Sequence, residues 1–179
     1  MGVVLVLGVS GSGKSTLAVE LGRRGLDAVD SDQVLGRWVD GSGDPVRRPE
    51  APDRTWLADH QWQWDRGDAE RLLASATGTV FVCGQADNVT EFFGLFDLVI
   101  LLELDTPTML KRLDDPARDN DFGRTGDTRE LLIDWAPGFQ ARMKELGAVV
   151  VDGRLPLAVV VDTVIRLAGH GGQTAASTC

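Results

Sequence analysis

Three glycines, a lysine and several hydroxyl residues lie together in the stretch GVSGSGKST, residues 8–16, directly after the apolar run VVLVL. Its residues match the pattern G-x-x-x-x-G-K-[ST], with a strand pattern before it and a helical pattern after it. Glycines let backbone N–H groups approach an anion closely, and the start of a helix adds partial positive charge. The stretch therefore predicts a phosphate loop for a nucleotide, formed by Gly8, Ser10, Gly11, Ser12, Gly13, Lys14, Ser15 and Thr16.

Two residues of this loop have separate expected roles. Lys14 would reach the β- and γ-phosphates, and the hydroxyl of Ser15 would join the shell of a magnesium ion. The alternative is a glycine-rich turn that binds nothing. The strand and helix patterns on either side favour the phosphate loop.

Two carboxylates, Asp30 and Asp32, end the second apolar run in the sequence VDSD. In open α/β sheets the carboxyl ends of strands present ligand-binding groups, and residues two apart on an extended backbone point the same way. One carboxylate would hold a hydrated magnesium ion while the other orients an attacking hydroxyl and accepts its proton. The alternative is that Ser31 and Asp32 only cap the following segment.

Arginines recur in the polar stretch KRLDDPARDNDFGRTGD, residues 111–127. Arg112, Arg118 and Arg124 are six residues apart, so one helical stripe does not explain them. Arginine stabilises the charge on a transferring phosphoryl group, and a closing lid excludes water. We predict a lid near residues 114–127, with Arg118 and Arg124 as catalytic residues and Arg112 and Arg118 as nucleotide contacts. A solvated loop is the alternative, because the stretch also holds five acidic residues.

The elements that position these motifs follow from hydrophobic periodicity. Strands are predicted at residues 3–7, 26–30, 79–83, 97–104 and 148–152, and helices at 14–21, 54–76, 88–93, 106–113, 128–146 and 155–169. Thr106 is the expected N-cap of one helix, and Pro137 is expected to bend or split another. Residues 31–53 are predicted to be irregular. The order predicts an α/β fold with a parallel sheet that is covered by helices on both faces.

The composition of the chain is typical of a globular protein. The chain has 179 residues, of which 43% are hydrophobic and 25% charged, as in one globular domain; we place it at residues 1–169, with a flexible tail over 170–179. A net charge of −9 argues against non-specific nucleic-acid binding. No signal peptide, membrane span or disulfide framework is expected. We expect a cytoplasmic monomer or homodimer whose partner is a small molecule.

The stretches GVSGSGKST, VDSD, GDPV followed by DRTWL, and VVDGRLPLAVVVDTVI together resemble the small-metabolite P-loop kinases, with gluconate kinases nearest. Shikimate kinases share the D-S-D stretch, and nucleotide-kinase-like P-loop proteins are similar in the stretches GQADN and NDFGR. The resemblance implies the P-loop NTPase fold with a five-stranded sheet and a lid, together with dependence on ATP and Mg²⁺. It also implies a substrate-binding segment near residues 31–64.

The same resemblance implies roles for individual residues. Ser15 and Asp30 would contact the metal ion, Asp32 the acceptor hydroxyl, and Arg54 an anionic group of the substrate. Gly84, in the stretch CGQADN after the third strand, is assigned to the substrate site. The loop DGRLP would contact adenine, which makes Arg154 a candidate nucleotide contact.

Several aromatic residues lie in the predicted substrate-binding segment. Trp56, His60 and Trp64 would share one face of the predicted helix at 54–76. Core packing is one interpretation, and a wall of the acceptor pocket is the other. Several arginines of the same region are either anion contacts or surface charges: Arg37, Arg47, Arg48 and Arg54.

Together these features predict an ATP-dependent phosphotransferase that moves the γ-phosphate to a hydroxyl of a small, anionic, sugar-acid-like metabolite. A nucleoside or nucleoside-monophosphate kinase is the alternative. A regulatory nucleotide-binding module without an acceptor is a further alternative of another class. GTPase switches fit poorly, because the fourth predicted strand runs into LDTPTML rather than a guanine-reading motif.

Overall fold

The computed structural model describes residues 2–118 and 120–171 and has the predicted α/β architecture. Five parallel strands form the central sheet in the order β2-β6-β1-β7-β8. Their bounds are Asp27–Asp30 for β2, Val80–Cys83 for β6, Val3–Gly8 for β1, Leu98–Glu103 for β7 and Val149–Asp152 for β8. Each lies within two residues of its predicted range, because a strand buried on both faces is a short, continuous apolar run.

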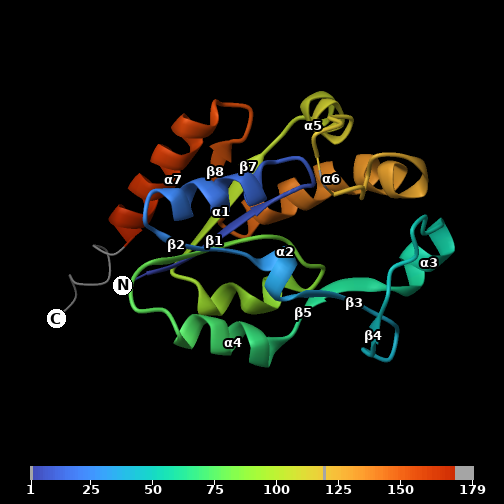
Figure 1. Ribbon diagram of the computed structural model, residues 1–179, viewed down its shortest axis with the longest axis horizontal. Helices are drawn as coiled ribbons and strands as arrows, with labels where there is room; N and C mark the ends of the chain where they lie inside the picture. The colour runs from blue at the N-terminus through green and yellow to red at the C-terminus, as the bar shows by residue number, and fades with distance from the viewer. Residues whose placement is uncertain (1, 119, 172–179) are drawn as a thin grey trace.

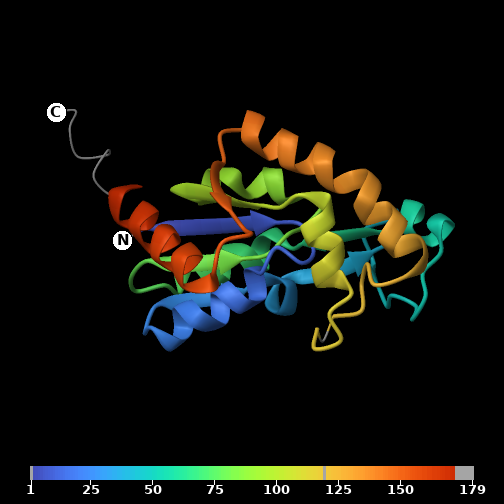
Figure 2. The ribbon, with the colours of Figure 1, turned by 90° about the horizontal axis from the view of Figure 1, so that it is seen from above.

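Helices cover both faces of the sheet (Figures 1 and 2). On one face, α1 (Lys14–Arg23) and α7 (Leu157–Gly171) pack against strand residues such as Val4, Val6 and Phe81. On the other, α4 (Arg66–Ala74), the 3₁₀ helix η1 (Val89–Leu95), α5 (Thr106–Leu113) and α6 (Gly126–Glu145) pack against Leu5, Leu7 and their neighbours. Successive strand residues point to opposite faces, so β1 contributes alternately to the two cores.

A small antiparallel sheet and the short helix α2 (Ser31–Val34) were not predicted. The sheet has the order β4-β3-β5, formed by Pro45–Val46, Gly36–Val39 and Gln61–Trp64. Helix α2 precedes it, and α3 (Arg54–Asp59) lies between β4 and β5. The small sheet and α3 lie at the end of the molecule toward which β1 runs (Figure 2). The prediction of an irregular segment over residues 31–53 was therefore wrong in part.

The predicted helix over residues 54–76 was wrong in part, because residues 54–59 and 66–74 are helical but the segment between them is not. It is α3, then strand β5, then α4, because β5 pairs with β3 in a register that sets Trp62 opposite Trp38. The Asn88 side chain also binds the backbone N–H and carbonyl of Trp64, each at 3.0 Å. Asp53 and Asp65 each cap a new helix, so tertiary pairing outweighs the helical spacing of the aromatic residues.

Smaller corrections concern helix ends. Asp105, not Thr106, is the N-cap of α5; its side chain accepts a hydrogen bond from the N–H of Thr108 at 2.7 Å. Helix α6 continues through Pro137 rather than splitting there. Residues 170–171 belong to α7, and the rest of the predicted tail, 172–179, lies outside the described residues.

Candidate functional site

The phosphate loop connects β1 to α1 in a conformation that depends on its glycines. Gly11 and Gly13 have φ values of 81° and 95°, which residues with a Cβ rarely adopt. A Cβ on Gly8 would lie 2.4 Å from the Oγ of Ser12. No side chain caps α1, so its first N–H groups remain available to an anion.

Lys14 lies buried beneath this loop, with 7% of its surface exposed. Its Nζ donates to the carbonyl oxygens of Gly8 at 2.8 Å and Val9 at 3.3 Å. Burial lowers the pKa of Lys14 because it penalises the charged amine, while Asp32 and Asp30 oppose that shift. Two carbonyls and two nearby carboxylates thus surround a cation that forms no direct ion pair among the described residues.

Asp30 and Asp32 lie at the carboxyl end of β2, but they do not share one extended strand as predicted. Asp30 caps the short helix α2 by accepting from the N–H of Asp32 at 3.1 Å. Asp32 belongs to α2 and accepts hydrogen bonds from the N–H of Gln85 at 3.0 Å and from the side chain of Trp62. Burial raises the pKa of Asp32, and the field of Lys14 and these hydrogen bonds oppose the rise.

Gly84 allows helix α2 to approach the end of β6. A Cβ at Gly84 would lie 1.7 Å from the Oγ of Ser31 and 2.9 Å from Oδ1 of Asp32. Ser31 is fully buried there and donates to the carbonyl of Cys83 at 3.2 Å. Gly84 therefore acts on the site through the position of Asp32.

We expect Gly84→Ala to displace α2, lower the free energy of unfolding by about 1–3 kcal/mol and reduce ADP release. Chemical unfolding and an ADP-release assay measure the two effects. Gly78→Ala is the matched control, because no atom lies within 4 Å of a Cβ at Gly78. Equal stability and activity in the two variants would contradict this role.

Trp62 positions Asp32 in a way that the sequence did not reveal. Its indole N–H is the only donor of that side chain, and it bonds to Asp32. The indole packs so closely on Gly36 that a Cβ there would lie 2.1 Å from a ring atom. The backbone of Trp62 is held by Asp87, through Oδ2 and through N–H, each at 2.7 Å. The alternation of QWQW was the available signal for a strand here.

We expect Trp62→Phe to raise the pKa of Asp32, because the indole hydrogen bond stabilises the carboxylate. If Asp32 works as a base, the acid limb of the pH–rate profile lies above the ordinary Asp value of 3.8 and moves higher in the variant. Stability of the wild type should fall as pH rises from that value through the raised pKa, since the folded state binds the extra proton. Trp56→Phe is the control, and an unmoved acid limb in Trp62→Phe would contradict the role.

The phosphate loop, Asp30, Asp32 and part of the lid line one cavity of about 1220 Å³. Gly153, Leu155, Leu157 and Val160 line it at the side of the loop after β8. Its other half is lined by aromatic and polar residues from the small sheet and the segments next to it, the loop after β6, the lid and α6: Trp38, Arg48, His60, Gln61, Trp62, Gln85, Asp87, Phe122 and Trp135. We call this second set the acceptor half.

Two of the predicted site arginines line this cavity. Arg112 donates to the carbonyls of Gly11 at 3.1 Å and Gly153 at 2.8 Å, and so joins the phosphate loop to the loop after β8. Arg118 donates to the carbonyl of Phe122 at 3.0 Å, and its Nη1 is buried without a hydrogen-bond partner among the described residues. Burial and the neighbouring Arg124 lower the pKa of Arg118.

Three other predicted site arginines lie outside the cavity lining. Arg124 donates to the carbonyls of Asp115 and Arg118 and so holds the lid's own backbone together. Arg154 pairs with Asp152 and Asp105 at 2.9 and 3.2 Å, and this pairing lowers the pKa of Asp152 to about 2. Arg54 pairs with Glu130 on α6 at 2.6 Å.

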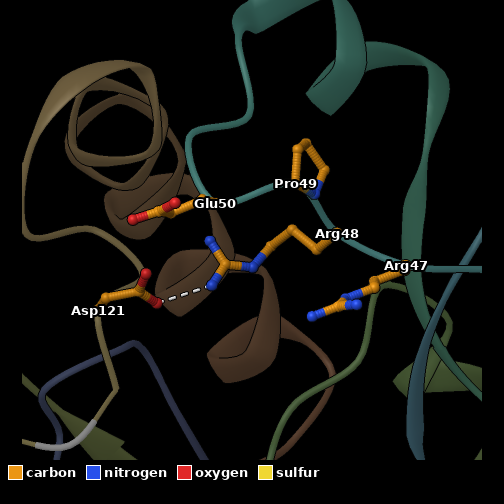
Figure 3. A pocket seen from close by; sticks show the side chains of 5 residues that line it. All are labelled: Arg47, Arg48, Pro49, Glu50 and Asp121. Carbon is orange, nitrogen blue, oxygen red and sulfur yellow. Dashed lines mark hydrogen bonds and ion pairs between the residues drawn. The ribbon is translucent and has the colours of Figure 1, made fainter.

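Of the remaining candidate anion contacts, Arg48 alone lines the cavity. Arg37 pairs with Asp68 at 2.7 Å. Figure 3 shows the guanidinium of Arg48 directed at Asp121, 2.7 Å away, in a second pocket that Arg47 also lines. Arg48 also lies over the ring of Phe122, 5.8 Å from its centroid.

The oxygen donors of the cavity suit a magnesium ion. In the described parts of the chain, no group of three or more His, Cys, Asp or Glu side chains is placed to hold a metal alone. The hydroxyl of Ser15 and the carboxylates of Asp30 and Asp32 line the cavity beside the phosphate loop. Mg²⁺ prefers such hard oxygen ligands and commonly shares its shell with water and substrate phosphates.

A family model described as "AAA domain" matches residues 4–131. Shikimate kinase from Acinetobacter baumannii, in complex with shikimate, is similar with a TM-score of 0.59 at 14% identity, over 97% of this chain and 96% of that chain. A gluconokinase from Sinorhizobium meliloti 1021 is similar at 0.53 and 21% identity, over 94% of each chain. Deoxyadenosine kinase from M. mycoides with bound dATP is similar at 0.55 and 14% identity, over 94% of this chain and all of that one.

No curated protein matches the chain. At these identities, the likeness to the solved structures shows a shared fold, that of the P-loop kinases. Within the part of the chain that the structure describes, no helix is long and apolar enough to cross a membrane.

Proposed function

We propose, for a chain that belongs to the AAA-domain family, that it transfers the γ-phosphate of ATP to a hydroxyl group of a small molecule. The observation that carries this proposal is the presence of Lys14, Asp32 and Arg118 in the lining of one cavity. Phosphoryl transfer depends mainly on positioning and on stabilising charge, and these three side chains supply both. The kinase folds of the similar structures support the same reaction class.

ATP with Mg²⁺ would supply the phosphoryl group and neutralise part of its charge. The phosphate loop and Lys14 would hold the phosphates, with Ser15 and Asp30 toward the metal ion. Asp32 would accept the proton of the acceptor hydroxyl on its carboxylate, and its raised pKa makes it a better base. Arg118 would stabilise the charge on the transferring oxygens, and Arg112 would keep the phosphate loop in place.

The placement of the arginines bears on the acceptor. The expectation of a sugar-acid-like anion drew on Arg37, Arg47, Arg48 and Arg54, and three of these four lie outside the cavity lining. The side chains therefore no longer favour an anionic acceptor over a neutral one.

A screen of ADP release against sugar acids, cyclitols, nucleosides and mononucleotides tests the proposal. We expect one class to stimulate ADP release well above the rate with ATP alone, with a phosphorylated product detectable by mass spectrometry. Tight ATP binding with slow hydrolysis that no compound stimulates would instead favour a regulatory nucleotide-binding module.

A further inference from the structure

We infer that the acceptor is an uncharged alcohol built on a planar heteroaromatic ring, as in a nucleoside, and that its ring binds against an aromatic wall. This wall consists of Trp38, Trp62 and Phe122, all of which line the acceptor half. The inference rests on the proposed function, since it names the class of molecule whose hydroxyl Asp32 would receive.

The wall is continuous although its members come from three separate segments. Trp38 on β3 lies 5.7 Å from Trp62 on β5 and 6.0 Å from Phe122 in the lid, measured between ring centroids. Behind it, Trp56 meets Trp38 edge-on at 5.0 Å and stacks on His60 at 4.1 Å. Core packing alone does not require three half-buried rings on the surface of a cavity, whereas a flat ligand uses such a surface for stacking.

One member of the wall, Trp62, also contacts Asp32, the proposed base. Trp62 bonds to Asp32 through its indole N–H, so the face of the wall lies beside that carboxylate. A molecule whose ring lies on Trp62 can place a hydroxyl on a short substituent near Asp32. The same contact that holds the base thus also helps to place the acceptor.

The charges of the acceptor half favour an uncharged ligand. Arg48 is already engaged by Asp121 and by the ring of Phe122. Asp87 lines the acceptor half, and Asp32 lines the same cavity. An anionic acceptor would meet two carboxylates and an arginine that must first leave its partner, and repulsion between like charges opposes that arrangement.

A polar group next to the wall favours a heteroaromatic ring over a plain aromatic one. Gln85 lines the cavity, and its Oε1 is buried without a hydrogen-bond partner in residues 2–118 and 120–171. Its Nε2 donates to the carbonyl of Ala86 at 3.0 Å, which leaves Oε1 free to accept. An amino group or ring N–H on the acceptor would satisfy this oxygen, whose lack of a partner is otherwise costly.

Direct binding without ATP tests the inference separately from phosphoryl transfer. The probes are adenosine, guanosine, cytidine and thymidine, with benzyl alcohol as a ring lacking N–H groups, and gluconate and shikimate as non-aromatic acids. Calorimetry and quenching of tryptophan fluorescence report binding. We expect at least one nucleoside to bind more tightly than every acid, and a preference for nucleosides over benzyl alcohol.

Variants then locate the bound ring. Trp38→Leu should weaken nucleoside binding by about 5- to 100-fold, as expected for loss of a base-stacking surface, and Trp38→Phe should weaken it much less. Phe96→Leu is the control, because Phe96 packs against the core outside the cavity lining, and the expected loss is at most about threefold. Thermal melting of each variant identifies one that fails to fold, and Trp38→Phe then carries the comparison.

Preferred binding of an acid that is lost in Arg48→Gln but not in Trp38→Leu would overturn the inference, and so would the absence of binding by any nucleoside at millimolar concentration. Stronger binding of benzyl alcohol than of any nucleoside would overturn the heteroaromatic part. A protein that binds a nucleoside through Trp38 but never transfers phosphate would refute the proposed function and leave the acceptor-half inference standing.

Discussion

Asparagine in place of Asp32 is expected to reduce stimulated ADP release by about 10²- to 10⁴-fold, the range typical for loss of a general base. The amide is nearly isosteric and still accepts the hydrogen bonds from Gln85 and Trp62, but it cannot take a proton. Nucleotide affinity should change by no more than a few-fold, because Asp32 acts on the acceptor hydroxyl. The measurements are kcat on the identified acceptor and ATP affinity by calorimetry.

Asp87→Asn provides the matched control for this substitution. Asp87 lines the same cavity as Asp32 and binds the backbone of Trp62, so the change tests whether any carboxylate there suffices. We expect a much smaller loss of kcat than in Asp32→Asn. Full kinase activity of Asp32→Asn would remove Asp32 from its proposed role.

Lys14→Met should abolish productive nucleotide binding, with a loss of more than about 10²-fold in kcat/KM, because preorganised charge at the phosphates is a large part of this catalysis. The fold should survive. Burial lowers the pKa of Lys14, which means that keeping this amine charged opposes folding at neutral pH. Methionine retains a long apolar side chain and removes that charge, so we expect a melting temperature equal to or above that of the wild type.

A second expected effect of Lys14→Met, on the pKa of Asp32, distinguishes loss of the charge from general disruption of the fold. Lys14 lowers the pKa of Asp32, so removing its charge should raise the pKa of that carboxyl further. An NMR titration of ¹³C-labelled aspartate carboxyl groups measures this shift. Lys111→Met, on the exposed surface of α5, is the control and should leave both properties unchanged. Normal ATP affinity in Lys14→Met would contradict the proposed phosphate site.

Local patterns were sufficient for the phosphate loop and for the central sheet. The loop is encoded within nine consecutive residues, and the glycines that it needs are required by backbone conformation alone. Asp30 and Asp32 were located because Asp30 ends, and Asp32 closely follows, a strand whose position is fixed by its apolar run. The strands of a doubly covered parallel sheet are recognisable because both faces are buried.

The roles of side chains that pair with residues distant in sequence could not be predicted from local patterns. Arg54 and Arg154 matched positions expected to bind ligand, yet each has acidic partners, on α6 for one and beside the end of β7 for the other. Glu130 lies 76 residues from Arg54, and Asp105 lies 49 residues from Arg154, so no local pattern predicts either pair, although Asp152, the second partner of Arg154, is only two residues away. Which ion pairs a long, charged side chain forms depends on which acidic groups the tertiary structure places within its reach.

The region from Trp56 to Trp64 shows most clearly which features follow from the sequence and which depend on tertiary contacts. The spacing of its aromatic residues predicted one helix, but pairing of β5 with β3 and the contacts of Asp87 and Asn88 make residues 61–64 a strand. The sequence by itself determined the phosphate loop, the parallel sheet and the base candidate Asp32, because these depend on local conformation and apolar runs. Only the tertiary structure decided that Trp62 holds Asp32, that Gly84 makes room for it and that Trp38 and Phe122 meet. Those contacts join segments distant in sequence, and their free energy depends on packing that no local pattern specifies.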